Sequence, residues 1–274
     1  MQRSMVFSLC ALAALPLAGT LAQGAANADI SAAQIIDRNI SARGGLSAWR
    51  AVKTLSWSGT MEAGGNARST LAVPTARTRA AMPAPRPQEQ AQLPFVMQME
   101  RPRKSRLELQ FHGQTALQVY DGKDGWKVRP YLNRHEVESY TADELKLAAQ
   151  QPDLDGPLVD YAAKGISVTL DGRDKVDGKD TYKLALTYKD KRVQHVWVDS
   201  QTFLEVKIDG APRRLDGRTH PVSVYMRDYK NVSGLLMPTV YETDVEGVSS
   251  REKISIDKIV VNPALTAAAF AKPK

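Results

Sequence analysis

The sequence predicts an α+β protein built on one large, curved antiparallel β-sheet. Apolar and polar residues alternate through most of the stretch from Leu55 to Val261, which is the period of half-exposed strands. Asp-Gly pairs, a strong short hairpin signal, separate many of these segments. The segments with a helical period supply only about 35 residues, too few to cover a sheet of about 11 strands unless that sheet curls.

Residues 1–28 predict a cleavable signal peptide. Arg3 precedes the apolar run Met5–Ala18, and small residues at positions 26–28 suit a signal peptidase. A membrane anchor is the competing interpretation, but a run of about 14 residues is shorter than the roughly 20 that cross a bilayer. Cleavage leaves residues 29–274 as a single domain. Because Cys10 lies in the leader, that domain depends on its apolar core rather than on disulfides.

Two short helices are expected at the start of the mature chain. Ser31 can cap the first helix, whose apolar stripe includes Ile35 and Ile40. The Gly-Gly pair at positions 44–45 ends it, and a second helix is expected from Leu46.

An up-and-down series of strands follows, interrupted by further helices at 141–148 and 158–163. The predicted strands cover residues 55–61, a segment that ends near 73, and residues 95–99, 107–111, 117–119, 126–128, 166–170, 182–188 and 204–208, with others continuing to 261.

Residues 74–94 differ in composition from the rest of the chain. They are rich in proline and alanine and show no apolar period, so they predict a flexible loop. Long loops without secondary structure are often functional, and a lid or a partner-binding arm is the alternative interpretation.

The charge pattern argues against a nucleic-acid partner. The formal net charge of +7 falls to +6 when Arg3 leaves with the leader. Lysines and arginines alternate with acids along the strands, and no basic strip is interleaved with aromatic residues. A solvated charged face is favoured, with attraction to anionic lipid headgroups as the alternative.

The sequence contains no persuasive catalytic motif, so we expect neither an enzyme, nor a metal site, nor a cofactor. His112, His135, His195 and His220 are far apart in the chain. His135 and the following Glu begin like a zinc-binding helix motif, but Ser139 stands where the second histidine belongs.

Six short motifs carry a resemblance to a known family. They are Gly44–Leu46 (GGL), Trp57–Gly59 (WSG), Arg101–Glu108 (RPRKSRLE), Tyr120–Trp126 (YDGKDGW), Asp155–Tyr161 (DGPLVDY) and Gly234–Pro238 (GLLMP). With these motifs the chain resembles the outer membrane lipoprotein-sorting proteins of the LolA/LolB-like superfamily, from about Ile30 to Phe270. The resemblance implies a periplasmic protein with an open half-barrel sheet, helices over the concave face, and an apolar cavity between them that takes acyl chains.

Nine apolar residues are the candidate lining of this cavity. They are Leu55, Trp57, Met61, Phe95, Met97, Met99, Leu107, Leu109 and Trp126. Methionine side chains adapt to varied partners, although each of the nine could instead be ordinary core. A 16-carbon chain carries roughly 12 kcal/mol of gross burial free energy, at about 0.8 kcal/mol per methylene, so it needs cover during transit through water.

The preferred function is therefore a periplasmic carrier that holds the acyl chains of a lipid or lipoprotein during outer-membrane lipoprotein sorting or lipid transport. We expect a monomer with no transmembrane segment after cleavage, which makes transient contact with membrane-bound donor or acceptor proteins. The alternative is an envelope sensor or adaptor similar to the RseB branch of the superfamily, which binds a protein partner.

Overall fold

A computed structural model describes residues 30–63, 91–151, 153–215 and 217–274. The predicted signal peptide, the predicted strand near residue 73 and most of the proline-rich segment lie outside these residues. Within them, residues 31–274 belong to one compact unit. The fold is α+β, as predicted, with one open and curved antiparallel sheet.

Thirteen of the described strands form this sheet. In spatial order they are β6 (Arg134–Ser139), β5 (Gly125–Arg129), β4 (Gln114–Tyr120), β3 (Lys104–Phe111), β2 (Ala91–Glu100), β1 (Thr54–Ala63), β15 (Glu252–Val261), β14 (Leu235–Val245), β13 (Val222–Val232), β10 (Glu205–Asp209), β9 (Val193–Asp199), β8 (Lys179–Thr187) and β7 (Ser167–Val176). A separate hairpin joins β11 (Arg213–Leu215) to β12 (Arg218–His220). The count exceeds the predicted 11 because short polar strands such as β6 show no apolar alternation.

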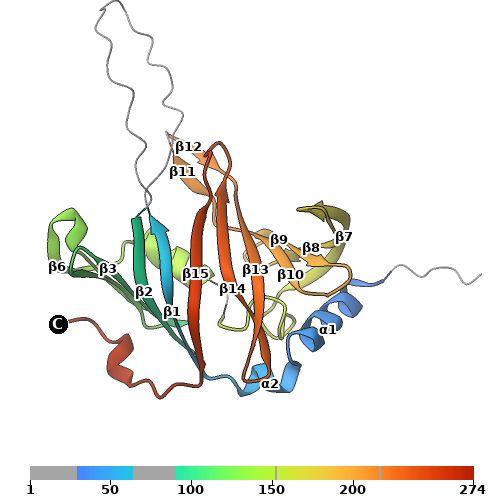
Figure 1. Ribbon diagram of the computed structural model, residues 1–274, viewed down its shortest axis with the longest axis horizontal. Helices are drawn as coiled ribbons and strands as arrows, with labels where there is room; N and C mark the ends of the chain where they lie inside the picture. The colour runs from blue at the N-terminus through green and yellow to red at the C-terminus, as the bar shows by residue number, and fades with distance from the viewer. Residues whose placement is uncertain (1–29, 64–90, 152, 216) are drawn as a thin grey trace, which may run out of the picture. The chain divides into compact units, whose positions relative to one another are not determined.

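Most neighbours in the sheet are also neighbours in sequence, as an up-and-down arrangement requires. The exception that unites the two halves is the pairing of β1 with β15, in which Leu55 lies opposite Val261. Figure 1 shows the result: β2, β1, β15, β14 and β13 stand side by side in the centre of the view.

The proline-rich segment is shorter than the sequence indicates at its C-terminal end. Residues 91–94 belong to β2, with Leu93 opposite Met61 and Pro94 opposite Thr60 of β1. Pro94 is exposed in the strand, and proline can occupy a strand where it does not have to donate a ladder hydrogen bond.

The helices are α1 (Ala32–Ala42), α2 (Leu46–Ala51) and α3 (Ala142–Gln150), with the 3₁₀ turns η1 (Pro130–Leu132) and η2 (Ala267–Phe270). Ser31 caps α1 as predicted, in a capping box with Gln34. The helix expected at 158–163 is wrong, because the chain there forms turns. Asp160 and Gly165 adopt left-handed backbone angles (φ 52° and 74°), which a right-handed helix cannot continue through.

The pairing register separates the sheet into two faces, and we call the one that contacts the helices the inner face. Partners across a ladder share a face. One row of the inner face consists of Lys127, Gln118, Leu107, Met97 and Trp57. A second consists of Met61, Ile254, Tyr241 and Met226. A third consists of Thr243, Val224, Ile208, Val196, Leu184 and Leu170.

The tightest part of the core lies where α1 and α2 meet the inner face. The fully buried side chains there include Ile35, Ile36, Trp49, Leu184, Leu186, Val196 and Leu235. Gly44, between the two helices, is required by a close approach: a Cβ at this position would lie 2.4 Å from the carbonyl oxygen of Gly234. The backbone oxygen of Arg43 also accepts a hydrogen bond from the N–H of Leu236 (3.1 Å), which fixes α2 at the end of the β13–β14 hairpin (Figure 1).

The outer face is charged and aromatic where β8, β9, β10, β13 and β14 pair. Trp197 lies under the ammonium groups of Lys183 and Lys207, 5.7 and 4.1 Å from the ring centre. Tyr225 likewise lies 4.1 Å from the guanidinium of Arg251, which pairs with Glu242. Because acids pair with cations here, as Asp171 does with Lys183, this part of the face carries mixed charge and is not a basic strip.

Candidate functional site

The register brings eight of the nine predicted lining residues onto the inner face. They come from three adjacent strands, β1, β2 and β3. Their cross-strand pairs are Leu55–Met99, Trp57–Met97, Met97–Leu107, Phe95–Leu109 and Met61–Leu93. These eight residues therefore form one contiguous apolar surface.

Burial divides these eight residues into two groups. Leu55 and Phe95 are buried, with 0% and 4% of their surface exposed. The other six, Trp57, Met61, Met97, Met99, Leu107 and Leu109, are only half-buried. Six half-buried apolar residues in one patch are unlike the solvated polar positions that normally meet water on a sheet.

Trp126 does not belong to this surface. It lies opposite Val119, which lies opposite Arg106, which in turn lies opposite Gln98. This row belongs to the outer face, because Gln98 is the neighbour of Met97 in β2 and neighbouring residues in a strand point to opposite faces. The sequence motif around the Asp-Gly turn indicates a strand but not its register, and a shift of one residue moves every side chain to the other face. We leave Trp126 out of the candidate site.

Sequence reasoning missed other members of the same surface. Leu93 and Phe111 continue it along β2 and β3, while Ile254, Tyr241 and Met226 extend it across β15, β14 and β13. All five are half-buried. Their apolar alternation is visible in the sequence, but only the pairing of β1 with β15 brings the C-terminal strands beside the N-terminal ones.

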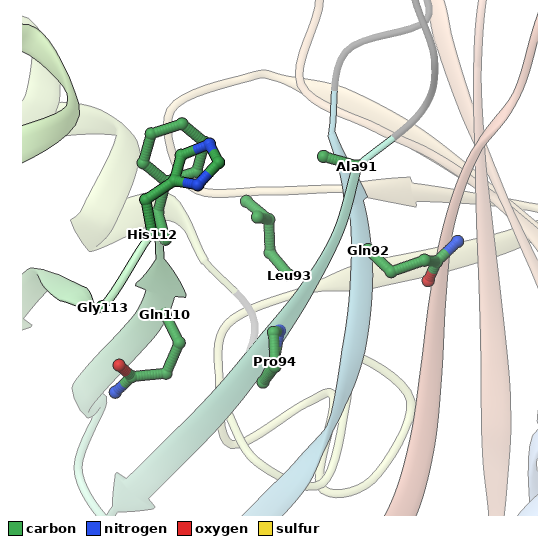
Figure 2. Close-up of a pocket in the computed structure, with 8 residues that line it drawn as sticks. Ala91, Gln92, Leu93, Pro94, Gln110, His112 and Gly113 are labelled. Carbon is green, nitrogen blue, oxygen red and sulfur yellow. The ribbon is translucent and has the colours of Figure 1, made fainter.

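A pocket of about 340 Å³ lies at one end of the apolar surface. Leu93, Pro94, Phe111 and His112 are among the residues that line it, and most of its lining is exposed to solvent. Figure 2 shows the side chain of Leu93 directed across the pocket towards His112. The ring of His112 meets that of Phe111 edge-on, with centroids 4.3 Å apart. The pocket therefore extends the row of Phe95 and Leu109 to the end of the strands.

One polar group is enclosed within the apolar surface. The indole N–H of Trp57 is buried and has no hydrogen-bond partner among the described residues. The ring of Trp57 stacks with that of Tyr241, and burial raises the pKa of the Tyr241 phenol above its usual range. The Tyr241 phenol therefore stays neutral. The indole N–H of Trp57, as a buried donor without a partner, costs free energy unless a ligand supplies an acceptor.

Helix α3 is attached to the inner face by polar contacts. Glu144 pairs with the buried ammonium of Lys127, and Thr141 caps the helix in a capping box with Glu144. At the other end, the guanidinium of Arg103 donates to the carbonyl oxygen of Ala149 (2.9 Å). No residue of α3 is buried, and Leu147 is 50% exposed. The helix is therefore attached to the sheet by polar contacts and not by a buried apolar interface of its own.

Buried ion pairs lie beside α1 and α2, where Arg101 also donates to the carbonyl oxygen of Trp49. Asp155 accepts from Arg101 (2.7 Å) and from Lys164 (2.5 Å), and its side chain is 2% exposed. Arg43, the C-cap of α1, pairs with Glu205 at 3.3 Å, and both side chains are buried. The pair of Arg43 with Glu205 joins the end of α1 to β10 of the sheet. Breaking such a buried pair is costly, because removal of one partner leaves a buried charge without compensation.

The described residues contain no group of three or more His, Cys, Asp and Glu side chains placed to hold a metal ion. The same part of the chain has no helix with the length and apolarity that crossing a membrane demands.

Solved structures define the class of this fold. A LolA superfamily protein from Nitrosomonas europaea superposes with a TM-score of 0.54 at 12% identity, over 89% of this chain and 98% of that one. A DUF1329 family protein from Desulfovibrio piger gives 0.53 at 15% identity, over 86% and 95%. A domain from Vibrio parahaemolyticus superposes with a TM-score of 0.51 at 12% identity, over 87% of this chain and 95% of that one. It is described, without proof of its function, as an outer membrane lipoprotein-sorting protein domain.

The fold is therefore LolA/LolB-like, as the motifs predicted. No protein-family model matches the sequence, and no curated protein matches it. At these identities the comparisons establish the fold, and the site must indicate the function.

Proposed function

We propose that this protein is a carrier in the bacterial periplasm that holds the acyl chains of a lipid or lipoprotein against the inner face of its sheet. One observation carries the proposal: six apolar residues of β1–β3 stay half-buried on the inner face, and α3, which is attached to that face at Lys127, buries none of its own residues. An alkyl chain on this surface would remove apolar area from water at about 25 cal/mol per Å².

The composition of the surface suits a ligand of variable shape. Met61, Met97, Met99 and Met226 share the inner face, and unbranched thioether side chains adapt to different partners. The unpartnered indole N–H of Trp57 would meet an ester or amide carbonyl at the head of an acyl chain. Ligand sites commonly combine an apolar wall with a few such polar groups.

The other parts of the proposal come from the sequence. The leader supports export, and the absence of a catalytic motif supports binding rather than catalysis. The carrier would act as a monomer without a cofactor, and would meet donor and acceptor proteins at membranes only transiently.

Lipid extraction and native mass spectrometry of the protein purified from a periplasm test this proposal. We expect an acylated molecule to copurify and to leave when the protein is denatured. An empty protein that instead copurifies in a stable complex with another protein would favour the sensor or adaptor function. A protein with neither ligand nor partner, which also fails to take up added fatty acid, would refute the carrier.

A further inference from the structure

A second pocket, of about 240 Å³, is lined by four cationic side chains, and we call it the cationic pocket. Arg103 comes from the β2–β3 turn, Lys164 from the turns before β7, and Lys189 and Arg192 from the β8–β9 turn. The C-terminal end of α3 closes one side through Ala149 and Gln150. Three segments distant in sequence therefore direct positive charge to one place.

Most of this charge is not neutralised by the protein. Of the two acids in the lining, Asp153 is engaged by Arg101 at 3.1 Å. Lys164 is the one cation fully engaged, by Asp155. Among the described residues Arg103 and Lys189 have no ion pair, and Asp190 approaches Arg192 only to 3.9 Å. Three cations thus face one acid.

The two cations of the β8–β9 turn are held in position. The guanidinium of Arg192 lies over the Tyr188 ring, 3.7 Å from its centre, and its buried Nε has no hydrogen-bond partner among the described residues. The stem of Lys189 crosses Gly165, where even a Cβ would lie 2.0 Å from the lysine Cε. The hydroxyl of Tyr188 is committed elsewhere, since it donates to Gln194 at 2.5 Å.

From this arrangement we infer that the cationic pocket binds the phosphate group of a ligand. The guanidinium of Arg103 from one turn, with the guanidinium and ammonium of Arg192 and Lys189 from another, suit the several oxygens of a tetrahedral phosphate better than one planar carboxylate. The volume fits a headgroup, because pockets for whole drug-sized ligands are about 300–1,000 Å³.

The position of the pocket relates it to the apolar surface. Arg103 lies at the end of β2 and β3 that is remote from the pocket around Leu93 and Phe111. A ligand with its phosphate beside Arg103 could lay its chains along Met99 and Met97 of β2. The inference deepens the proposed function and rests on it, because the phosphate would give a carried amphiphile its polar anchor.

Isothermal titration calorimetry with soluble probes tests the inference. The probes are dihexanoyl phosphatidylglycerol below its micelle concentration, inorganic phosphate, and acetate as a carboxylate. We expect Lys189→Gln and Arg192→Gln each to weaken phospholipid binding by about tenfold, the cost of one charge-assisted hydrogen bond. Lys191→Gln is the matched control, since this exposed residue belongs to the same turn but not to the pocket lining.

The probes also identify the source of the phosphate. Binding of the phospholipid without inorganic phosphate would support a lipid headgroup, and equal binding of both would support a free phosphate group. Wild-type protein that binds no phosphate probe, or acetate binding as tight as phosphate binding, would overturn the inference. So would unchanged affinity in Lys189→Gln, an exposed position where folding is not at risk.

A parallel titration with a fluorescent alkyl probe that lacks phosphate separates this inference from the proposed function. Loss of phosphate binding with intact alkyl binding refutes only the headgroup site. Absence of alkyl binding in the wild-type protein refutes the carrier itself.

Discussion

Trp57 of β1 and Tyr241 of β14 stack across the intervening strand β15, with ring centroids 5.9 Å apart and an angle of 25° between the rings. Adjacent strands lie about 4.8 Å apart, so both rings must lean over β15 on the inner face. This contact joins the N-terminal and C-terminal halves of the apolar surface, and it encloses the unpartnered N–H of Trp57.

We expect Trp57→Phe to change the free energy of unfolding by less than about 1 kcal/mol. Phenylalanine keeps the aromatic contact and removes a buried donor that has no partner, so the two effects oppose each other. Trp57→Ala, which loses the ring, should cost about 2 kcal/mol or more. Urea denaturation of the ligand-free protein measures both, and a larger loss in Trp57→Phe than in Trp57→Ala would contradict this account of the N–H.

Asp155→Ala should destabilise the protein by about 3–5 kcal/mol, because it leaves the ammonium of Lys164 without its carboxylate partner and leaves Arg101 with Asp153 alone. Asp180→Ala is the control. Its pair with Lys175 is 72% exposed on both sides, and loss of such a pair costs less than about 1 kcal/mol. Thermal or chemical unfolding compares the two, and equal effects would show that Asp155 does not anchor the helices.

Glu144→Gln should loosen α3 selectively. Glutamine keeps the capping box with Thr141, but it removes the charge that pairs with Lys127. Faster hydrogen exchange of α3 amides near neutral pH, with the exchange of β13 and β14 amides unchanged, is the expected result. Exchange that accelerates throughout the sheet would mean that α3 is part of the cooperative core.

The same contact makes the attachment of α3 depend on pH. Burial alone would raise the pKa of Glu144, but hydrogen bonds from Lys127 and Thr141 outweigh it and lower the pKa below its usual value. A lowered carboxyl pKa adds stability above the unfolded-state value of about 4.3, and this stability is lost as the pH falls through the folded-state pKa. Below that value wild-type α3 should exchange like Glu144→Gln, whose own protection should change little over the same range.

The sequence was sufficient for the fold and for most of the apolar surface. Period-2 alternation identified β1–β3, and Ser31 and Thr141 marked two helix starts by their capping chemistry. The helix expected at 158–163 failed because Asp160 takes a left-handed conformation that its neighbours in sequence do not reveal. The placement of Trp126 in the lining was wrong because alternation shows which residues of one strand share a face, but not which of the two faces is the inner one.

Long-range pairing accounts for what the sequence could not predict about the site. Tyr241 and Ile254 join Met61 only because β15 returns to pair with β1 nearly 200 residues later in the chain. The cationic pocket likewise assembles Arg103 with Arg192, which no local motif connects.

The most direct test of the account compares Met97→Asp with Gln98→Asp. The two residues are adjacent in β2, both half-buried, and point to opposite faces. Uptake of a fluorescent fatty acid is measured for each, with thermal unfolding recorded beside it to confirm folding. We expect Met97→Asp to reduce affinity by at least about tenfold, since it places a charge where alkyl chains bind, while Gln98→Asp stays close to wild type. Unchanged uptake in a folded Met97→Asp protein, or an equal loss in both variants, would contradict the claim that the inner face is the ligand site.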